Sequence, residues 1–175
     1  CVTRNRRLEP FWRFVVSPNR ALLRHPAGWI ATGFGSGFAP KASGTVGSLA
    51  ALLPWWFLRE LPPWAYLAVC AGFFALSVWA AQWVIDEIRV DDPGLVVADE
   101  WVGLWLTLFL LPDGLHWIAI GFAVFRFFDI LKPWPVSWAD QKLHGGFGSM
   151  LDDALAGVYG WLTVSALVSL SSRGL

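Results

Sequence analysis

The sequence predicts an all-α protein: a compact polytopic membrane bundle of about four to five apolar helices, preceded by an amphipathic or basic amino-terminal segment. Two observations predict this class. The 175-residue chain is 56% hydrophobic and 15% charged, with thirteen Trp and thirteen Phe, which is too apolar for an ordinary soluble domain. Residues 64–85 carry no formal charge, and as a helix they would cross a hydrocarbon core of about 30 Å.

We expect a basic arm over residues 1–25 and a single domain over residues 26–175. The arm contains six Arg and one Glu, with aromatic residues between them. This composition suits an anionic membrane surface, although a mobile solvated tail would show the same pattern. Only two cysteines are present, and Cys70 lies inside an apolar run, so a disulfide framework is not expected.

Four further apolar runs are shorter or interrupted by polar residues or proline: 46–58, 101–111, 115–131 and 154–170. A soluble helical core could also contain such runs, but the aromatic-rich flanks favour a membrane bundle. When the five segments alternate across a bilayer, ten Lys and Arg fall on the side of residues 1–45, 86–100 and 132–153, against two on the other side. The positive-inside rule then makes the first side cytoplasmic.

The same alternation places every unusual polar motif on that one side, so the motifs predict a shared site. The central motif is Asp99-Glu100, because two adjacent carboxylates next to an apolar run cost about 2.5–3.5 kcal/mol each at membrane depth unless they are compensated. A metal ion or catalysis would explain the pair, and a structural ion pair with Arg89 or Arg126 is the alternative.

A stretch rich in glycine and hydroxyl groups, residues 32–45, leads into an apolar run. Exposed backbone N–H groups at a helix start can hold an anion, with Lys41 as a nearby charge. The stretch lacks the Gly-Lys-Ser/Thr of a Walker A loop, and a Gly-rich membrane re-entry is an equal alternative.

Arg126, Asp129 and Lys132 follow one another at i, i+3 and i+6, so they share one stripe at the end of a predicted helix that Pro133 stops. Lys132 would suit a phosphate oxygen, whereas Arg126 and Asp129 could form a buried ion pair. Asp152 and Asp153 begin the last apolar run, where they could oppose the helix dipole or join a carboxylate site for Mg²⁺.

Several phosphate chemistries are excluded. Cys70 lies in an apolar run and not in an electropositive loop, no Cys/His cluster suits zinc, and no motif supports a histidine nucleophile. Metal-assisted attack by water or by a carboxylate remains.

Four segments together resemble the phosphatidylglycerophosphatase A family over roughly residues 26–170: ATGFGSGFAPKASGTVGS, DDPGLVVADEWVG, FRFFDILKPWPVSWAD and HGGFGSMLDDALAG. The resemblance implies a multi-pass protein of the bacterial inner membrane with its site facing the cytoplasm. It also implies Mg²⁺-dependent removal of the terminal phosphate of phosphatidylglycerophosphate. The chain departs at Ser43, where many members have Pro, and this change bears on loop rigidity.

The resemblance places the family's acidic positions on Asp92, Asp99, Glu100, Asp129, Asp152 and Asp153, and its basic position on Lys132. From the residues and the resemblance together, we expect the following roles. The expected catalytic residues are Asp99, Glu100, Asp129, Lys132, Asp152 and Asp153, and the first three acids with Asp153 are expected to hold Mg²⁺. The expected substrate-binding residues are Thr32, Gly33, Gly35, Ser36, Lys41, Gly44, Thr45, Arg126, Lys132 and His144. Asp152 and Asp92 remain open as the acid that activates water or attacks directly.

Phospholipid and membrane are the expected partners, nucleic acid is not, and the oligomeric state is open. Two other classes remain possible. A transporter or channel would spread its carboxylates through the membrane, and a scaffold would tolerate Asp129→Asn or Glu100→Gln without loss of any activity.

Overall fold

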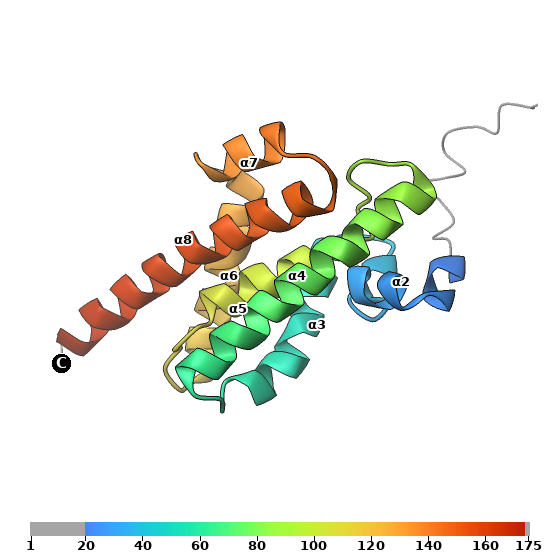
Figure 1. Cartoon of the computed structure of the whole chain (residues 1–175). Coiled ribbons are helices and arrows are strands. Elements are labelled where there is room, and N and C mark those ends of the chain that lie inside the picture. The colour runs from blue at the N-terminus through green and yellow to red at the C-terminus, as the bar shows by residue number, and fades with distance from the viewer. Residues whose placement is uncertain (1–19, 174–175) are drawn as a thin grey trace, which may run out of the picture.

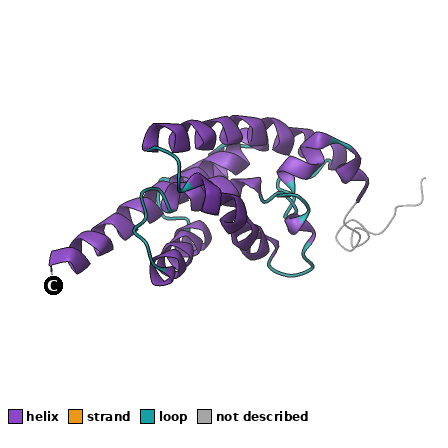
Figure 2. Cartoon of the chain, turned by 90° about the horizontal axis from the view of Figure 1, so that it is seen from below, coloured by secondary structure: helices purple, strands orange, loops and turns teal. Residues whose placement is uncertain are grey.

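The computed structural model describes residues 20–173, and this part of the chain consists of helices and connecting loops, without a β-strand (Figures 1 and 2). The predicted all-α class is therefore confirmed. Residues 1–19, which include most of the predicted basic arm, lie outside the described residues. With η for a short 3₁₀ helix, the order is η1 (Arg20–Arg24), α2 (Pro26–Ala31), η2 (Ser36–Phe38), α3 (Ser43–Leu58), α4 (Pro63–Ile88), α5 (Ala98–Thr107), α6 (Leu115–Leu131), α7 (Val136–Lys142) and α8 (Gly145–Arg173).

Helix α5 lies at the centre of the bundle, with α3, α4, α6 and α8 packed around it (Figure 1). Seven of its ten residues are buried. The Trp105 indole N–H donates to the Ala51 carbonyl of α3 at 2.9 Å, and the Tyr66 hydroxyl of α4 donates to the Trp105 carbonyl at 2.6 Å. Because these bonds join α5 to two neighbouring helices, they fix its position inside the apolar core.

Helices α5 and α8 approach each other closely at two glycines. A Cβ atom on Gly103 would lie 2.6 Å from the carbonyl oxygen of Asp153, and one on Gly157 would lie 2.9 Å from the Cα of Gly103. Neither position has room for a side chain, so the two backbones touch. This contact brings the start of α8 against the first turns of α5.

Helices α4 and α8 are long and apolar enough to cross a membrane by length and composition. The other apolar helices are shorter: α3 has 16 residues with Pro54 inside it, and α6 has 17. Helix α5 has 10 residues, which rise about 15 Å, or half of a hydrocarbon core. Residues 101–111 therefore do not form a full-length spanning helix of their own, because the helix ends at Thr107 and is buried inside the bundle. The chain still runs through α5 from one end of the bundle to the other.

The ends of distant helices meet at two ends of the bundle, here called the site end and the far end. The starts of α3, α5 and α8 and the end of α6 surround one cavity at the site end. At the far end, Arg59 after α3 forms an ion pair with Asp113 before α6. The carboxyl-terminal part of α8 extends beyond the other helices (Figures 1 and 2).

Replacing Gly103 by Ala should destabilise the protein by about 1–3 kcal/mol, because the new methyl group would overlap the Phe125 ring and the α8 backbone. Gly72→Ala in α4 is the matched control, since its Cβ would meet nothing within 4 Å, and it should be neutral or stabilise by up to about 1 kcal/mol. Thermal unfolding in detergent measures both. Equal melting temperatures for the two variants would contradict the close α5–α8 contact.

Candidate functional site

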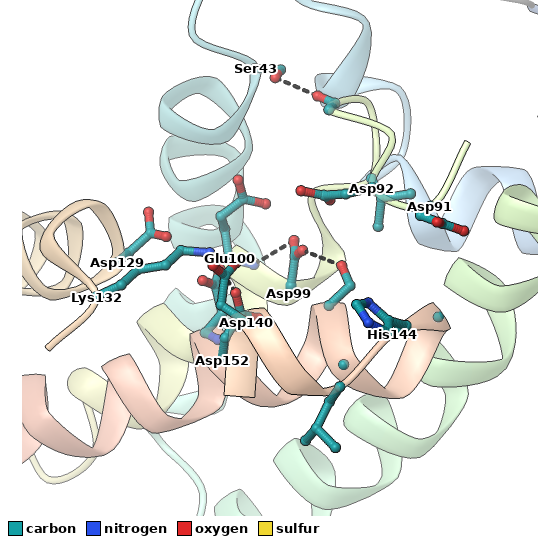
Figure 3. A pocket seen from close by; sticks show the side chains of 17 residues that line it. Ser43, Asp91, Asp92, Asp99, Glu100, Asp129, Lys132, Asp140, His144 and Asp152 are labelled. Atoms are coloured by element: carbon teal, nitrogen blue, oxygen red, sulfur yellow. Dashed lines mark hydrogen bonds and ion pairs between the residues drawn. The ribbon is translucent and has the colours of Figure 1, made fainter. Parts of the chain in front are cut away.

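A cavity of about 230 Å³ at the site end is lined by eight acidic side chains, one lysine and one histidine (Figure 3). These carboxylates come from four parts of the chain: the α4–α5 loop with the start of α5, the end of α6, α7, and the third turn of α8. They are Asp91, Asp92, Asp99, Glu100, Asp129, Asp140, Asp152 and Asp153. The structure thus brings together all the acids that the sequence singled out, and adds Asp91 and Asp140. Because α8 begins at Gly145, Asp152 and Asp153 do not lie in its first turn, and the alternative that they oppose the helix dipole is wrong.

The first turn of α5 presents Asp99 and Glu100, where negative charge is favourable for the helix dipole. Both oxygens of Asp99 accept hydrogen bonds. The Glu100 amide donates to Oδ1 at 2.9 Å, and the Ser149 hydroxyl of α8 donates to Oδ2 at 3.1 Å. The Asp99 carboxylate is therefore oriented from both helices.

Asp99, Glu100 and Asp153 each offer a carboxylate oxygen that lies within 4.8 Å of the other two. Glu100 Oε2 is also buried and has no hydrogen-bond partner among the described residues. Such an oxygen is costly unless a cation or a donor occupies the space beside it. Hard carboxylate oxygens suit Mg²⁺ or Ca²⁺, so these three residues fit a divalent ion of that kind.

The electrostatics agree with this interpretation. Burial raises the pKa of Asp99, which hydrogen bonds from Glu100 and Ser149 partly offset. Burial also raises the pKa of Glu100, and the negative charges of Asp99, Asp153 and Asp129 raise it further. The carboxylates therefore repel one another, and a divalent cation among them would relieve that repulsion.

Arg126 joins the acids of α5 and α6. Its Nη1 atom lies 2.6 Å from Asp129 Oδ2, one turn along the same helix, and 3.9 Å from Glu100 Oε1. The ion pair between Arg126 and Asp129 that the sequence left open is thus present. Because the same guanidinium approaches Glu100, it holds Asp129 beside the three-carboxylate group.

Lys132 ends α6 in a left-handed backbone conformation, with φ 44°, directly before Pro133. Its ammonium group contacts two carboxylates, Asp152 Oδ2 of α8 at 2.7 Å and Asp140 Oδ1 of α7. Burial lowers the pKa of Lys132, but the hydrogen bonds and charges of Asp140 and Asp152 outweigh this and raise it above the usual value. The lysine therefore carries its positive charge at the edge of the carboxylate group.

The start of α3 reaches the same cavity. Ser43 lines it and donates to the Gly94 carbonyl at 2.5 Å, which joins α3 to the α4–α5 loop. A Cβ atom on Gly44 would meet Glu100 Oε1 and lie 3.1 Å from Arg126 Nη1, so a larger residue would displace these charged groups. The first N–H groups of α3 have no intrahelical partner and lie beside the site.

The glycine-rich loop before α3 does not form the predicted anion cradle. The backbone N–H groups of residues 33–39 all donate to carbonyl oxygens between Trp29 and Ser36, so none of them is free for a ligand. Thr32 is fully buried, and its hydroxyl donates to the Gly28 carbonyl. The structure thus places Thr32, Gly33, Gly35 and Ser36 in a packed turn outside the cavity lining.

The remaining predicted residues lie at the rim or outside it. Asp92 and His144 are exposed residues of the cavity lining. Lys41 is exposed and Thr45 is half-buried, and neither is among the lining residues. Asp152 is buried, and its second oxygen, Oδ1, accepts a hydrogen bond from the Asp153 amide at 3.0 Å.

The sequence did not predict the ion pair between Asp140 and Lys132. Asp140 lies eight residues after Lys132, and the prolines between them end one helix and allow another to turn back. Such a turn returns a short helix to the end of the preceding one. The alternating Pro residues at 133 and 135 were the available signal.

The fold and the cavity define an all-helical protein with membrane-spanning potential and a carboxylate site suited to a divalent ion and a phosphate group. The model of the family described as Phosphatidylglycerophosphatase A matches residues 29–168, and the chain belongs to this family. The resemblance inferred from the four sequence motifs is thereby confirmed.

Two relatives carry that family name. The chain is 41% identical over 145 residues to phosphatidylglycerophosphatase A of Escherichia coli K12, covering 82% of this chain and 84% of the relative. It is 42% identical over 147 residues to the Haemophilus influenzae protein of the same name, covering 83% and 90%. A Bacteroides thetaiotaomicron protein provisionally named as a phosphatidylinositol-3-phosphatase is 41% identical over 144 residues, covering 78% and 89%. No solved structure gives a significant match.

Glu100→Gln should lower the affinity for Mg²⁺ by about tenfold or more, because it removes a charged ligand oxygen while keeping the side-chain volume. Titration calorimetry on the purified protein in detergent measures this affinity. Asp113→Asn is the matched control, since it removes an acid that contacts a cation at the far end, and it should bind Mg²⁺ as the unmodified protein does. Equal Mg²⁺ affinity for Glu100→Gln and the unmodified protein would argue against the site.

Proposed function

We propose that this protein is a Mg²⁺-dependent phosphatase that hydrolyses the terminal phosphomonoester of phosphatidylglycerophosphate to phosphatidylglycerol and phosphate. The observation that carries the proposal is the meeting of Asp99, Glu100 and Asp153 within 4.8 Å, beside a charged lysine, in a chain of this family. A carboxylate group of this kind is negative by itself. A divalent ion bound among the carboxylates would let the site attract a phosphate, and this supports metal-assisted chemistry.

In this proposal, Asp99, Glu100, Asp129 and Asp153 hold Mg²⁺. Arg126 fixes Asp129 through the 2.6 Å ion pair, and Ser149 fixes Asp99 through its hydroxyl. When bound, the ion would supply a positive charge for the phosphate oxygens and for the charge that develops on them.

The phosphate would lie between Lys132 and the start of α3, where Gly44 and Thr45 present backbone N–H groups. Gly44 allows this approach because any side chain there would collide with Glu100. His144 adds a polar group to the cavity lining, and Arg126 contacts Glu100 and Asp129 beside it. Lys41, exposed two residues before Ser43, would add a positive charge near the start of α3. Thr32, Gly33, Gly35 and Ser36 support this arrangement from behind, since their turn packs against the α4–α5 loop and Trp101.

Hydrolysis requires a water molecule to attack phosphorus while the bond from phosphorus to the glycerol oxygen breaks and that oxygen gains a proton. Both oxygens of Asp152 already accept hydrogen bonds, one from Lys132 and one from the Asp153 amide. Asp152 is therefore better suited to hold Lys132 than to attack. Asp92, exposed at the rim, is the better candidate to take the proton from water.

We also propose that residues 26–175 form one polytopic membrane domain in the bacterial inner membrane, with the basic arm of residues 1–25 before it. Helices α3, α4, α6 and α8 would surround the buried α5, and the site end would face the cytoplasm. The charge pattern of the sequence supports this orientation, since the five-segment alternation assigns ten Lys and Arg to the side of the site motifs and two to the other side.

The rival classes fit less well. A channel or transporter would need carboxylates along a path through the bundle, whereas the eight acids that line the site cavity lie at one end of it. In a non-catalytic scaffold, the buried Glu100 oxygen without a hydrogen-bond partner would only destabilise the fold. A second lipid phosphate deserves a test because of the Bacteroides relative, whose provisional name refers to phosphatidylinositol 3-phosphate.

Purified protein in mixed micelles should release phosphate from phosphatidylglycerophosphate with Mg²⁺, and removal of Mg²⁺ by EDTA should lower the rate about a hundredfold or more. Glu100→Gln should lower the rate of phosphate release in the same direction as EDTA does, and Asp113→Asn should release phosphate at the rate of the unmodified protein. A parallel assay with phosphatidylinositol 3-phosphate should give the lower kcat/KM. No phosphate release from phosphatidylglycerophosphate, with or without Mg²⁺, would refute the proposal.

The orientation predicts which end a reagent reaches from outside the cell. In a protein without Cys1 and Cys70, Asp113→Cys at the far end should react with a membrane-impermeant maleimide on intact spheroplasts. Lys142→Cys at the site end should react only after permeabilisation. The reverse pattern would place the site on the outer face.

A further inference from the structure

We propose that Asp140 is a positioning residue that holds the ammonium group of Lys132 at the mouth of the cavity, so that one N–H bond remains directed at the substrate phosphate. This inference rests on the proposed function, because it concerns how Lys132 meets a phosphate.

The path of the chain explains why Asp140 lies where it does. Pro133 stops α6 directly after Lys132, and α7 then packs against α8, with Val136 and Ala139 buried. The Tyr159 hydroxyl of α8 donates to the Trp134 carbonyl at 3.0 Å and anchors the turn between α6 and α7. Asp140 follows the buried Ala139, so the anchored helix presents its carboxylate to Lys132.

The number of N–H donors on Lys132 shows what the contact with Asp140 leaves available for a ligand. A lysine ammonium has three N–H bonds, and among the described residues it contacts two carboxylates, Asp140 from α7 and Asp152 from α8. Two fixed acceptors on separate helices remove most of the conformational freedom of the four-carbon lysine side chain. One donor then remains for a ligand oxygen.

Asp140 differs from the acids that would hold the ion. The carboxylate oxygens that converge come from Asp99, Glu100 and Asp153, whereas the carboxylate of Asp140 forms an ion pair with Lys132. Asp140 is also more exposed, with 39% of its side chain accessible against 8% for Asp152. The geometry therefore assigns Asp140 to the lysine and not to the metal.

The kinetic test uses Asp140→Asn, Asp140→Glu, Lys132→Met and the double variant of Asp140→Asn with Lys132→Met. Asp140→Asn should raise KM for phosphatidylglycerophosphate about tenfold with a smaller change in kcat, and Asp140→Glu should recover most of the loss. In the Lys132→Met protein, Asp140→Asn should have no further effect, because the group it positions is gone. Independent, additive effects of the two substitutions would overturn the inference.

A readout that needs no substrate separates this inference from the proposed function. Amine labelling followed by mass spectrometry compares Lys132 with the exposed Lys41 and Lys142 in the same sample. Asp140→Asn should speed the labelling of Lys132 several-fold relative to those lysines, and Asp113→Asn should not. Unchanged protection of Lys132 in Asp140→Asn would overturn the inference even in a protein that shows full phosphatase activity.

Two further measurements exclude a merely structural or a metal-binding role. Asp140→Asn should keep the melting temperature and the Mg²⁺ affinity of the unmodified protein. A lower melting temperature that Asp140→Glu does not restore would make Asp140 a packing residue, and a weaker Mg²⁺ affinity would make it a ligand; either result would overturn the assignment. If the unmodified protein releases no phosphate, the proposed function fails while the labelling result still decides the Asp140–Lys132 contact.

Discussion

The structure depends on one electrostatic constraint: carboxylates from several helices lie close together at one end of an apolar bundle, where their repulsion is poorly screened. Asp99, Glu100 and Asp153 converge within 4.8 Å, and Asp129 lies beside them. Two cations from the end of α6 offset part of this charge, Arg126 on one side and Lys132 on the other. The remaining excess of charge is negative, and a bound divalent ion would balance it.

The apolar core serves this arrangement by fixing distances between backbones. Gly103 and Gly157 allow α5 and α8 to touch, and the contact brings Asp153 to the same level as Asp99 and Glu100. Gly44 similarly lets the start of α3 approach Glu100. Small residues in the bundle thus set the spacing of the charged groups. The close approach that they allow lets α3, α4, α6 and α8 pack around the short helix α5.

The sequence predicted the helical class and the meeting of the acids, because alternating apolar segments return successive loops to the same end. It could not predict that the backbone N–H groups of the loop at residues 32–38 are bonded to carbonyl groups of the same turn. Composition does not reveal whether backbone N–H groups are free, and here they are bonded within the turn. It also missed Asp140, since that contact depends on the direction α7 takes after Pro133. The sequence also could not show that residues 101–107 form a buried helix, because apolar residues suit a buried helix as well as a lipid-facing one.

The size of the cavity bears on how a lipid would reach it. A volume of about 230 Å³ lies below the range of about 300–1,000 Å³ of typical small-molecule pockets, so it suits a phosphorylated headgroup but not acyl chains. Ile130, Leu131 and Trp134 are exposed around Lys132, and in a membrane they would lie against the lipid. In the proposed function, the acyl chains would remain in the bilayer while the phosphate enters the cavity, and the polar rim residues Asp91, Asp92 and His144 would decide which headgroup is accepted.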